Sequence, residues 1–222
     1  MRLTGIQAVT FDVGGTLIEP WPSVGHVYAE IAASHGIANL SHDELQRRFV
    51  SVFHRRARSP HTAEEWAQIV DETFTGLAVE LPSKTFFPEL YERFAQAAAW
   101  RIYPDVEPTL TALAGRGLKL GIISNWDDRL RPLLILLGLA RRFESIVVSC
   151  EIGVSKPSLA IFRKASEQLD VPPQSILHVG DSFGMDVQGA ITAGLQAVQL
   201  EREDKPIRNG QIESLLALLS LV

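Results

Sequence analysis

The chain has a single cysteine, Cys150, among its 222 residues. One cysteine cannot form a disulfide within the chain, so the small disulfide-stapled folds are excluded and secretion gains no support. No positively charged segment followed by an apolar stretch opens the sequence, as a secretory signal would require. These absences predict a cytoplasmic protein.

Long apolar runs and long basic runs are missing as well. The longest apolar stretches, residues 133–140 and 215–222, are too short to span a bilayer. Lys and Arg number 21 against 26 Asp and Glu, and the densest basic cluster is confined to residues 54–58. We therefore expect a globular protein with neither a membrane nor a nucleic acid as partner.

Apolar, β-prone segments alternate with helical patterns over much of the chain. The candidate strands are residues 6–11, 118–123, 145–149, 176–179 and 195–200. The helical patterns are residues 106–114, 127–137, 159–169 and 185–193. Alternation of this kind with short connections predicts an α/β fold with a doubly wound parallel sheet.

Residues from about 20 to 100 break this alternation, because they hold four amphipathic helix patterns and no convincing strand. Apolar side chains recur at helical spacing in four groups: Val24, Val27, Tyr28 and Ile31; Leu45, Phe49, Val52 and Phe53; Trp66, Ile69, Val70, Phe74 and Leu77; Phe86, Phe87, Leu90, Tyr91 and Phe94. Two of the patterns open with capping boxes, Ser41-x-x-Glu44 and Thr62-x-x-Glu65. We expect a helical unit of residues 19–101 inserted into a core of residues 1–18 and 102–222.

Reactive side chains follow the predicted strands. In a doubly wound sheet the carboxyl ends of the strands form the crevice where ligands bind. The residues expected there are Asp12, Gly14, Gly15, Thr16, Ser124, Asn125, Lys156, Asp181, Ser182 and Asp186. Each has an ordinary structural explanation when taken alone, such as capping a turn or a helix. Together, carboxylates, a lysine and several donors are what Mg²⁺ and a phosphoryl group need.

Four stretches carry these residues in a fixed order. They are FDVGGTL (11–17), ISNWD (123–127), Lys156-Pro157 within SCEIGVSKPSLAIF, and VGDSFGMD (179–186). In order and spacing they resemble the four motifs of the haloacid dehalogenase superfamily, over nearly the whole chain apart from the interior of the inserted unit. The resemblance implies a Rossmann-like core with a helical cap inserted after the first strand.

The resemblance also implies a role for each residue at the strand ends. Asp12 is implied as the nucleophile, and an aspartate that attacks phosphorus divides hydrolysis into formation and breakdown of an acyl phosphate. The transferring group is implied to contact Gly15, Thr16, Ser124, Asn125 and Lys156. Magnesium is implied to bind Asp12, the carbonyl of Gly14, Asp181 and Asp186. The metal and Lys156 would offset the repulsion between nucleophile and phosphate.

Gly14 departs from the family pattern. Phosphatases of this superfamily usually carry a second aspartate two residues after the nucleophile, as general acid and base. Glycine still offers a carbonyl to the metal but cannot transfer a proton, a function worth typically about 10²- to 10⁴-fold in rate. We expect slow turnover, a leaving group that needs no proton, or replacement of the acid from the cap, where Glu19, His26, His54 and His61 lie.

Other mechanisms within the superfamily fit less well. Dehalogenases displace halide from carbon without a metal, but they generally carry tyrosine at the Gly14 position and another six residues after the lysine, where this chain has Phe162. Phosphonatases use a cap lysine, and the first lysine here is Lys84, late in the cap.

The leading hypothesis is a Mg²⁺-dependent phosphatase of a small phosphorylated metabolite. The alternatives are a metal-independent dehalogenase-like hydrolase and a ligand-binding or regulatory protein with little turnover. A monomer and a homodimer both stay open, because the sequence does not say how much of the cap helices is exposed.

Overall fold

The structure is a computed structural model that describes residues 3–56, 62–202, 206–208 and 210–222. The chain forms two compact units. Unit 1 comprises Met1–Ile18, Ile102–Asn125 and Leu137–Val222, and unit 2 comprises Glu19–Arg101 and Trp126–Leu136. The segment Trp126–Leu136, which the sequence predicts as part of the core, therefore groups with the inserted helices.

Unit 1 is built on a six-stranded sheet with the order β5-β4-β1-β6-β7-β8, in which every pair of neighbours is parallel. The strands are β1 (Ala8–Phe11), β4 (Lys119–Ser124), β5 (Ser145–Val148), β6 (Ile176–Gly180), β7 (Gln196–Leu200) and β8 (Gln211–Ile212). Every residue of β1 and β6 is buried, which is why these strands are nearly continuous apolar runs. The predicted α/β fold with a Rossmann-like, doubly wound parallel sheet is confirmed.

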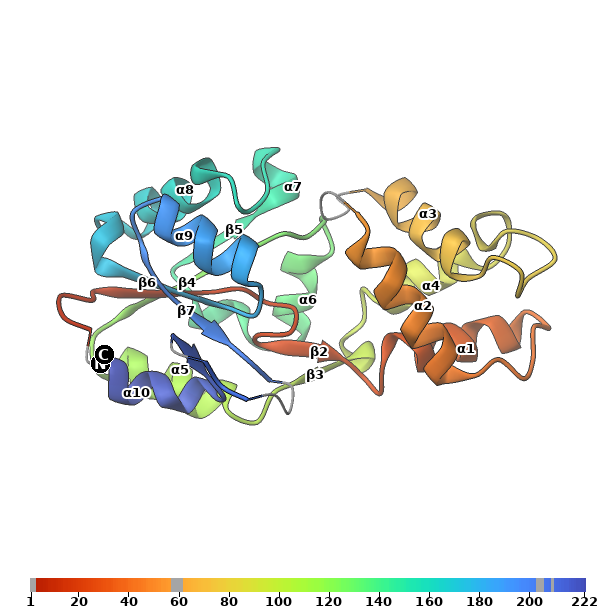
Figure 1. Ribbon diagram of the computed structural model, residues 1–222, viewed down its shortest axis with the longest axis horizontal. Helices are drawn as coiled ribbons and strands as arrows, with labels where there is room; N and C mark the ends of the chain where they lie inside the picture. Colours follow the sequence, from red (N-terminus) through yellow and green to blue (C-terminus); the bar gives the residue numbers. More distant parts are fainter. Residues whose placement is uncertain (1–2, 57–61, 203–205, 209) are drawn as a thin grey trace. The chain divides into compact units, whose positions relative to one another are not determined.

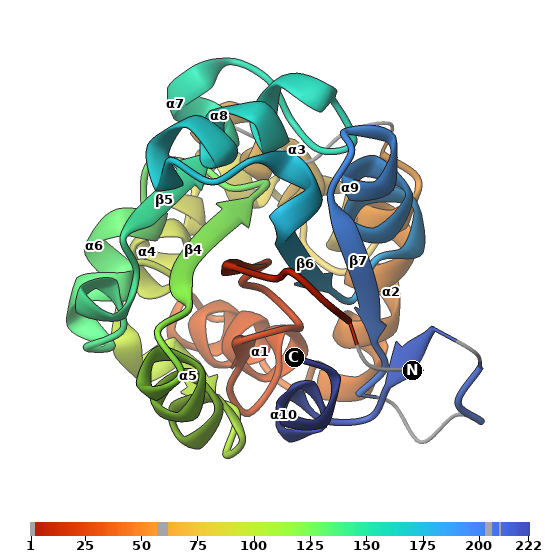
Figure 2. The ribbon, with the colours of Figure 1, turned by 90° about the vertical axis from the view of Figure 1, so that its left-hand side faces the viewer.

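Helices cover both faces of this sheet. They are α5 (Val106–Gly115), α7 (Ser149–Ile152), α8 (Leu159–Leu169), α9 (Gly189–Thr192) and α10 (Leu218–Leu221), with 3₁₀ turns at Ala140–Arg142, Pro173–Ser175 and Leu215–Ala217. Figure 2 shows α5 and α10 on one face and α7, α8 and α9 on the other. Because helices cover both faces, a ligand can reach the sheet at the edge formed by the carboxyl ends of the strands.

The strand order reverses at the centre of the sheet. From β1 the chain goes on to β4 and β5 on one side, and from β6 it goes on to β7 and β8 on the other. A reversal of this kind opens a crevice between the two strands at their carboxyl ends. The residues that follow β1 and β6 therefore occupy the position where ligands bind in open α/β sheets.

Unit 2 is a helical bundle with an aromatic core. Its helices are α1 (Val24–Ser34), α2 (His42–His54), α3 (Ala63–Thr73), α4 (Phe87–Arg93) and α6 (Leu130–Leu136), with 3₁₀ turns at Pro82–Lys84 and Ala97–Ala99 (Figure 1). The ring of Tyr28 stacks on Phe74 and meets Phe49 and Phe94 edge-on. The four predicted helices are all present.

The helix starts and the connections of unit 2 agree with the capping patterns. The hydroxyls of Ser41 and Thr62 each accept a hydrogen bond from the backbone N–H three residues on, at 3.3 Å in both cases. The chain passes between the two units at a two-stranded sheet of β2 (Ile18–Pro20) and β3 (Trp100–Ile102). Among the described residues, no helix combines the length and apolar character needed to cross a membrane.

Two predicted helices differ from the observed ones for local reasons. Helix α6 begins at Leu130 and not at 127, because the carboxylate of Asp127 accepts the backbone N–H of Arg129 at 3.0 Å and holds a turn there. The predicted helix 185–193 is a π-helix, η5 (Phe183–Gln188), followed by α9. π-helical turns are rare and are found frequently at functional sites.

Candidate active site

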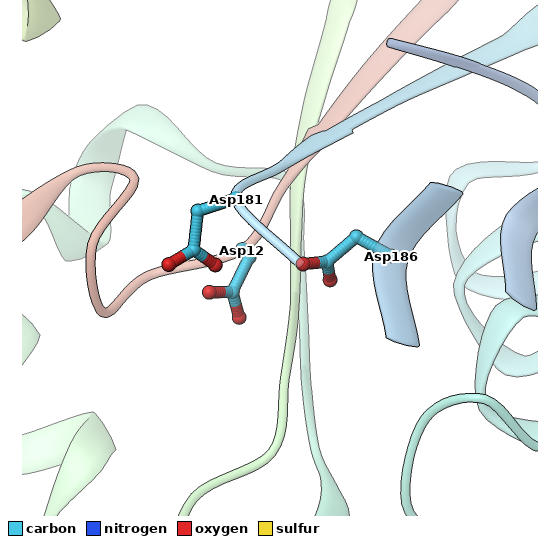
Figure 3. Close-up of side chains that lie close together, drawn as sticks. All are labelled: Asp12, Asp181 and Asp186. Carbon is cyan, nitrogen blue, oxygen red and sulfur yellow. The ribbon is translucent and has the colours of Figure 1, made fainter. Parts of the chain in front are cut away.

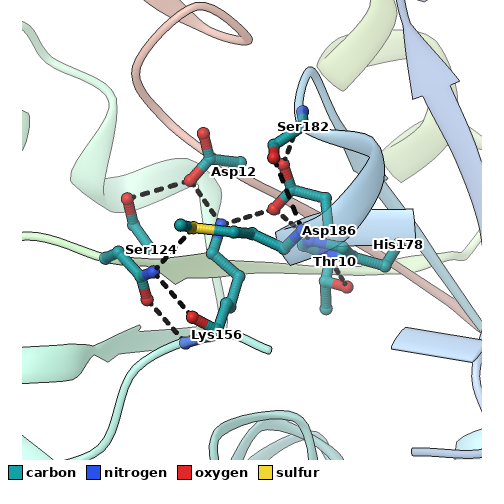
Figure 4. A network of polar contacts seen from close by, with 9 residues as sticks. Thr10, Asp12, Ser124, Lys156, His178, Ser182 and Asp186 are labelled. Atoms are coloured by element: carbon teal, nitrogen blue, oxygen red, sulfur yellow. Dashed lines mark hydrogen bonds and ion pairs between the residues drawn. The ribbon is translucent and has the colours of Figure 1, made fainter. Parts of the chain in front are cut away.

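A lysine ammonium lies between two carboxylates at the carboxyl edge of the sheet. Nζ of Lys156 is 2.6 Å from Oδ1 of Asp12 and 2.6 Å from Oδ1 of Asp186 (Figure 4). All three side chains are almost completely buried. Burial alone would lower the pKa of Lys156, but the two carboxylates outweigh it and raise that pKa above its ordinary value. The lysine is therefore a permanent positive charge in a site with little water.

Asp181 completes a cluster of three carboxylates. Asp12 follows β1, Asp181 follows β6, and Asp186 lies on η5, with one oxygen of each group within 4.8 Å of those of the others (Figure 3). Asp181 is exposed as a whole residue, but its carboxyl lies beside that of Asp12 and is shielded from water there. Loss of water around this group, followed by the charges of Asp12 and Asp186, raises the pKa of Asp181 to about 7. Such crowding of carboxylates is relieved by a cation.

The pKa values of the other two carboxyl groups shift in opposite directions, although burial acts upward on both. Burial raises the pKa of Asp12, against the opposing charge of Lys156. For Asp186, burial also acts upward, but Lys156 and then His178 outweigh it and hold its pKa well below the usual range. Asp186 is therefore the carboxylate that stays ionised, and it anchors the ammonium beside Asp12.

Glycines let the backbone approach these carboxylates. Gly15 has a φ of 74°, and a Cβ added there would come within 2.4 Å of Oδ2 of Asp181. A Cβ at Gly180 would come within 2.2 Å of Cγ of Asp186. Gly15 combines the left-handed backbone with this close approach, so we expect that position to accept no other residue.

The predicted hydroxyl and amide donors occupy three different situations. Oγ of Ser124 donates to Oδ1 of Asp12 at 3.1 Å, on the same oxygen that Lys156 holds. Asn125 pairs with the backbone of Lys156 through both ends of its amide, at 3.1 and 2.7 Å, so it fixes the lysine segment. Oγ1 of Thr16 is buried and has no hydrogen-bond partner in the described part of the chain. A buried hydroxyl without a partner is unusual, and a bound ligand atom would satisfy it.

The π-helix η5 positions the last carboxylate. The backbone oxygen of Ser182 accepts from the N–H of Asp186 at 2.9 Å and of Val187 at 3.3 Å. In return, the N–H of Ser182 donates to Oδ2 of Asp186 at 2.9 Å. These reciprocal bonds close the turn that begins directly after β6. The GDS sequence therefore folds so that Asp186 returns toward Lys156.

Two buried polar residues beneath the cluster are absent from the sequence-based assignment. The ring of His178 on β6 lies 3.2 Å from Oδ1 of Asp186 and 3.0 Å from Oγ1 of Thr10 on β1 (Figure 4). Both residues are completely buried. The available signal is their polarity within strands that are otherwise apolar and predicted to be buried. Their pairing with each other cannot be read from the sequence, because 168 residues separate them.

Two of the cap residues considered as substitutes for the missing acid have polar partners of their own. Glu19 forms an ion pair with Arg101, and His26 shares a 2.8 Å hydrogen bond with Oγ of Ser23. His54 is the last residue of α2, and His61 lies outside the described residues.

Phe162, six residues after Lys156, is a residue of the hydrophobic core. Phe162 is completely buried, and its ring meets the ring of His178 edge-on, with centroids 5.4 Å apart. Its contacts are those of the hydrophobic core between α8 and the sheet. The residue therefore packs, and it brings no hydroxyl to the site.

Similarity to known proteins agrees with this geometry. A family model described as haloacid dehalogenase-like hydrolase matches residues 6–194. The chain is 31% identical over 204 residues to haloacid dehalogenase-like hydrolase domain-containing protein 3 of Mus musculus, with 86% of this chain and 80% of that protein covered. It is 40% identical over 106 residues to glyceraldehyde 3-phosphate phosphatase of Methanopyrus kandleri, with 45% and 43% covered.

A solved structure of similar length points the same way. The crystal structure of a HAD phosphatase from Thermococcus onnurineus has a TM-score of 0.68 and 30% sequence identity to this chain, and 97% of each chain is covered. The family model spans both the carboxylate cluster and the helical insertion. The chain therefore belongs to the haloacid dehalogenase-like hydrolase family, and it is a hydrolase of the phosphatase-like kind.

Proposed function

We propose that the protein is a Mg²⁺-dependent phosphatase that hydrolyses a small phosphorylated molecule through a phosphoryl group on Asp12. The observation that carries this proposal is the placement of Lys156, whose ammonium contacts both Asp12 and Asp186 at 2.6 Å within a cluster of three carboxylates. A buried positive charge beside a nucleophilic carboxylate offsets the repulsion between that carboxylate and an approaching phosphate dianion. The relative named glyceraldehyde 3-phosphate phosphatase supports the substrate class.

The hydrogen bonds of Asp12 favour one of its oxygens as nucleophile. Ser124 and Lys156 both donate to Oδ1, so we assign the attack on phosphorus to Oδ2. The Oδ2–P bond forms while the bond from phosphorus to the leaving oxygen breaks, and that oxygen keeps the electron pair. Water then attacks the same phosphorus, the Oδ2–P bond breaks, and inorganic phosphate is released.

The chain's own residues are suited to hold the metal. Three carboxylate groups that each offer an oxygen within 4.8 Å form a hard, anionic donor set of the kind Mg²⁺ prefers. The pKa of Asp181 is raised first by loss of water around its carboxyl and then by the negative charges of Asp12 and Asp186, and a bound cation would offset both effects. We assign Asp12, Asp181 and the carbonyl of Gly14 as ligands, with Asp186 supporting them. When bound, the metal would neutralise charge that develops on the phosphoryl oxygens.

Gly14 shapes the proposed reaction on the side of the leaving group. With no side chain there, the leaving oxygen takes its proton from water or leaves as an anion. Turnover is then expected to be slow unless the leaving group is stable as an anion. A cytoplasmic location and a monomeric or homodimeric state are further predictions.

The test is hydrolysis of 4-nitrophenyl phosphate, whose leaving group needs little protonation, with Mg²⁺ and after its removal by a chelator. We expect Mg²⁺-dependent turnover that falls by more than about 10³-fold in Asp12→Asn, because the nucleophile is lost. Asp170→Asn is the matched control, since it makes the same chemical change at the exposed C-terminal end of α8.

Each other outcome has a defined meaning. Turnover that survives the chelator would reject the metal requirement and favour displacement chemistry of the dehalogenase kind. Turnover that survives in Asp12→Asn would reject the phosphoryl-aspartate. Mg²⁺ binding without turnover in the unaltered protein would favour a ligand-binding role.

A further inference from the structure

His178 contacts the site from beneath and touches none of the positions where substrate would react. It lies in the middle of β6, next to Thr10 of β1 in the register of the two parallel strands. Both residues are completely buried, and the ring of Phe162 packs edge-on against the imidazole with centroids 5.4 Å apart. The imidazole therefore has a fixed place and two polar neighbours, Thr10 and Asp186.

The chemistry of its neighbours determines which ring nitrogen carries the proton. Oδ1 of Asp186 already accepts from Lys156, and a carboxylate can only accept, so Nε2 of His178 is the donor in the 3.2 Å contact. In a buried neutral imidazole the other nitrogen accepts, so the hydroxyl of Thr10 donates to Nδ1 at 3.0 Å. Every polar atom in this chain of contacts then has a partner.

The carboxylate of Asp186 is consequently held at three points. Lys156 and His178 donate to Oδ1, and the backbone N–H of Ser182 donates to Oδ2 at 2.9 Å. Of the two donors to Oδ1, Lys156 is a flexible side chain that can follow this oxygen if the carboxylate turns about its last torsion, which is broad for aspartate. The imidazole of His178 is fixed in a buried strand, so its bond to Oδ1 narrows that rotation. The same Oδ1 of Asp186 also accepts from the ammonium of Lys156, so its position determines how that ammonium is directed toward Asp12.

We propose that His178 is a positioning residue of this site: through the Nε2–H bond to Asp186, with Thr10 fixing the tautomer, it orients Asp186 and thereby the ammonium of Lys156 toward Asp12. The inference rests on the proposed function only for its kinetic readout. It assigns a role to a residue that neither binds the phosphoryl group nor exchanges a proton with it. Partners that orient the groups of a metal site typically contribute about 10- to 100-fold in affinity or activity.

The test compares His178→Leu, which removes both ring nitrogens, with His178→Gln, whose amide can still donate to Asp186. We expect His178→Leu to lower kcat for 4-nitrophenyl phosphate by about 10- to 100-fold with little change in KM, and His178→Gln to recover most of it. Calorimetric titration with MgCl₂ alone should show the same ranking. Leu177→Val is the control for packing in the same strand, because Leu177 is equally buried and alternates to the opposite face.

A spectroscopic arm separates this inference from the proposed function. In the ¹⁵N spectrum of labelled protein, His178 should carry its proton on Nε2, and Thr10→Val should weaken that preference. If the unaltered protein hydrolyses no phosphate, the proposed function fails, while the Mg²⁺ titration and the tautomer still decide the role of His178. A proton on Nδ1, a folded His178→Leu protein with unchanged kcat and Mg²⁺ affinity, or a glutamine variant no better than leucine would each overturn the proposal.

Discussion

At the scale of single residues, neighbouring glycines in the first motif have different freedom to change. Gly15 takes a left-handed φ of 74° and lies against Asp181, whereas Gly14 is not among the described glycines with positive φ. A side chain at Gly14 therefore meets no conformational penalty of the kind that Gly15 would impose. The missing acid is therefore a property of the side chain, and a substitution at Gly14 tests its role.

We expect Gly14→Asp to raise the rate most for substrates with poor leaving groups. A carboxylic acid there would protonate an alkoxide, which contributes typically about 10²- to 10⁴-fold, but would help 4-nitrophenolate little. The measurement is the ratio of kcat/KM for an alkyl phosphate to that for 4-nitrophenyl phosphate. Gly14→Asn is the control of similar size without a transferable proton. An equal rise in both variants, or an unchanged ratio, would show that protonation does not limit the reaction.

The sequence identifies the residues at the strand ends because each directly follows an apolar run. Asp12 and Asp181 follow β1 and β6, so their convergence on one edge can be predicted from the alternation of strands and helices alone. Their exact partners cannot. That Asn125 holds the backbone of Lys156, and that His178 reaches Asp186, depend on side-chain directions that only the packed structure fixes.

At the scale of elements, a buried ion pair fastens the segment before α6 within unit 2. The guanidinium of Arg129 donates to both oxygens of Asp127, at 3.0 and 2.6 Å, and to the backbone oxygen of Tyr91 at 2.9 Å. Nε1 of Trp66 also donates to Asp127 at 2.6 Å, and Arg129 stacks 3.6 Å above the ring of Tyr91. We call these four residues the α6 clasp. The clasp connects Asp127, at the end of the ISNWD stretch, to α3 through Trp66 and to α4 through Tyr91.

We expect Arg129→Met to destabilise unit 2 by about 3–5 kcal/mol, because it leaves the completely buried carboxylate of Asp127 without its counter-ion. All four tryptophans belong to unit 2, so tryptophan fluorescence during urea unfolding reports on this unit. Adding Asp127→Asn should recover part of the loss, since no buried charge then remains.

The control for the α6 clasp is an exposed ion pair. Arg55 at the end of α2 and Glu72 of α3, both in unit 2, lie 3.6 Å apart with 65% and 47% of their side chains exposed. Arg55→Met should change the free energy of unfolding by at most about 1 kcal/mol. A loss of similar size in Arg129→Met would mean that the clasp adds no more than a surface pair.

The helix patterns show why element types are easier to predict than their ends. Periodic apolar residues and hydroxyl caps correctly locate α2 and α3, since both signals are local. The start of α6 is shifted by the side chain of Asp127, and η5 replaces an α-helix because Ser182 and Asp186 bond to each other. In both cases a polar side chain competes with the regular backbone pattern.

At the scale of the whole chain, a second buried ion pair joins its distant parts within unit 1. Asp105, just before α5, accepts from Arg202 at 3.0 and 3.2 Å, from Oγ of Ser214 at 2.8 Å and from the N–H of Leu215 at 2.8 Å. Arg202 also donates to the carbonyl of Thr16 at 2.6 Å. The C-terminal segment is thereby attached to the turn that follows Asp12. Separations of 97 to 186 residues put this network beyond prediction from sequence.

This network makes a specific prediction for stability as a function of pH. Partial burial acts to raise the pKa of Asp105, but the hydrogen bonds from Arg202, Leu215 and Ser214 outweigh it and lower that pKa below its ordinary value of 3.8. The folded state therefore binds a proton more weakly than the unfolded state does. The stabilisation is complete above pH 3.8 and is lost as the pH falls through the lower folded pKa.

We expect Asp105→Asn to lower the free energy of unfolding by about 1.5–3 kcal/mol at pH 7, the range for hydrogen bonds to a charged group. The difference from the unaltered protein should shrink below pH 4, because that protein then loses the same carboxylate by protonation. Urea unfolding followed by circular dichroism at pH 7 and pH 3 measures both values. Asp170→Asn serves as control, since this exposed residue has a φ of 51°, which asparagine tolerates. An Asp105→Asn difference of equal size at both pH values would show that packing, and not the charge, attaches the C-terminal segment.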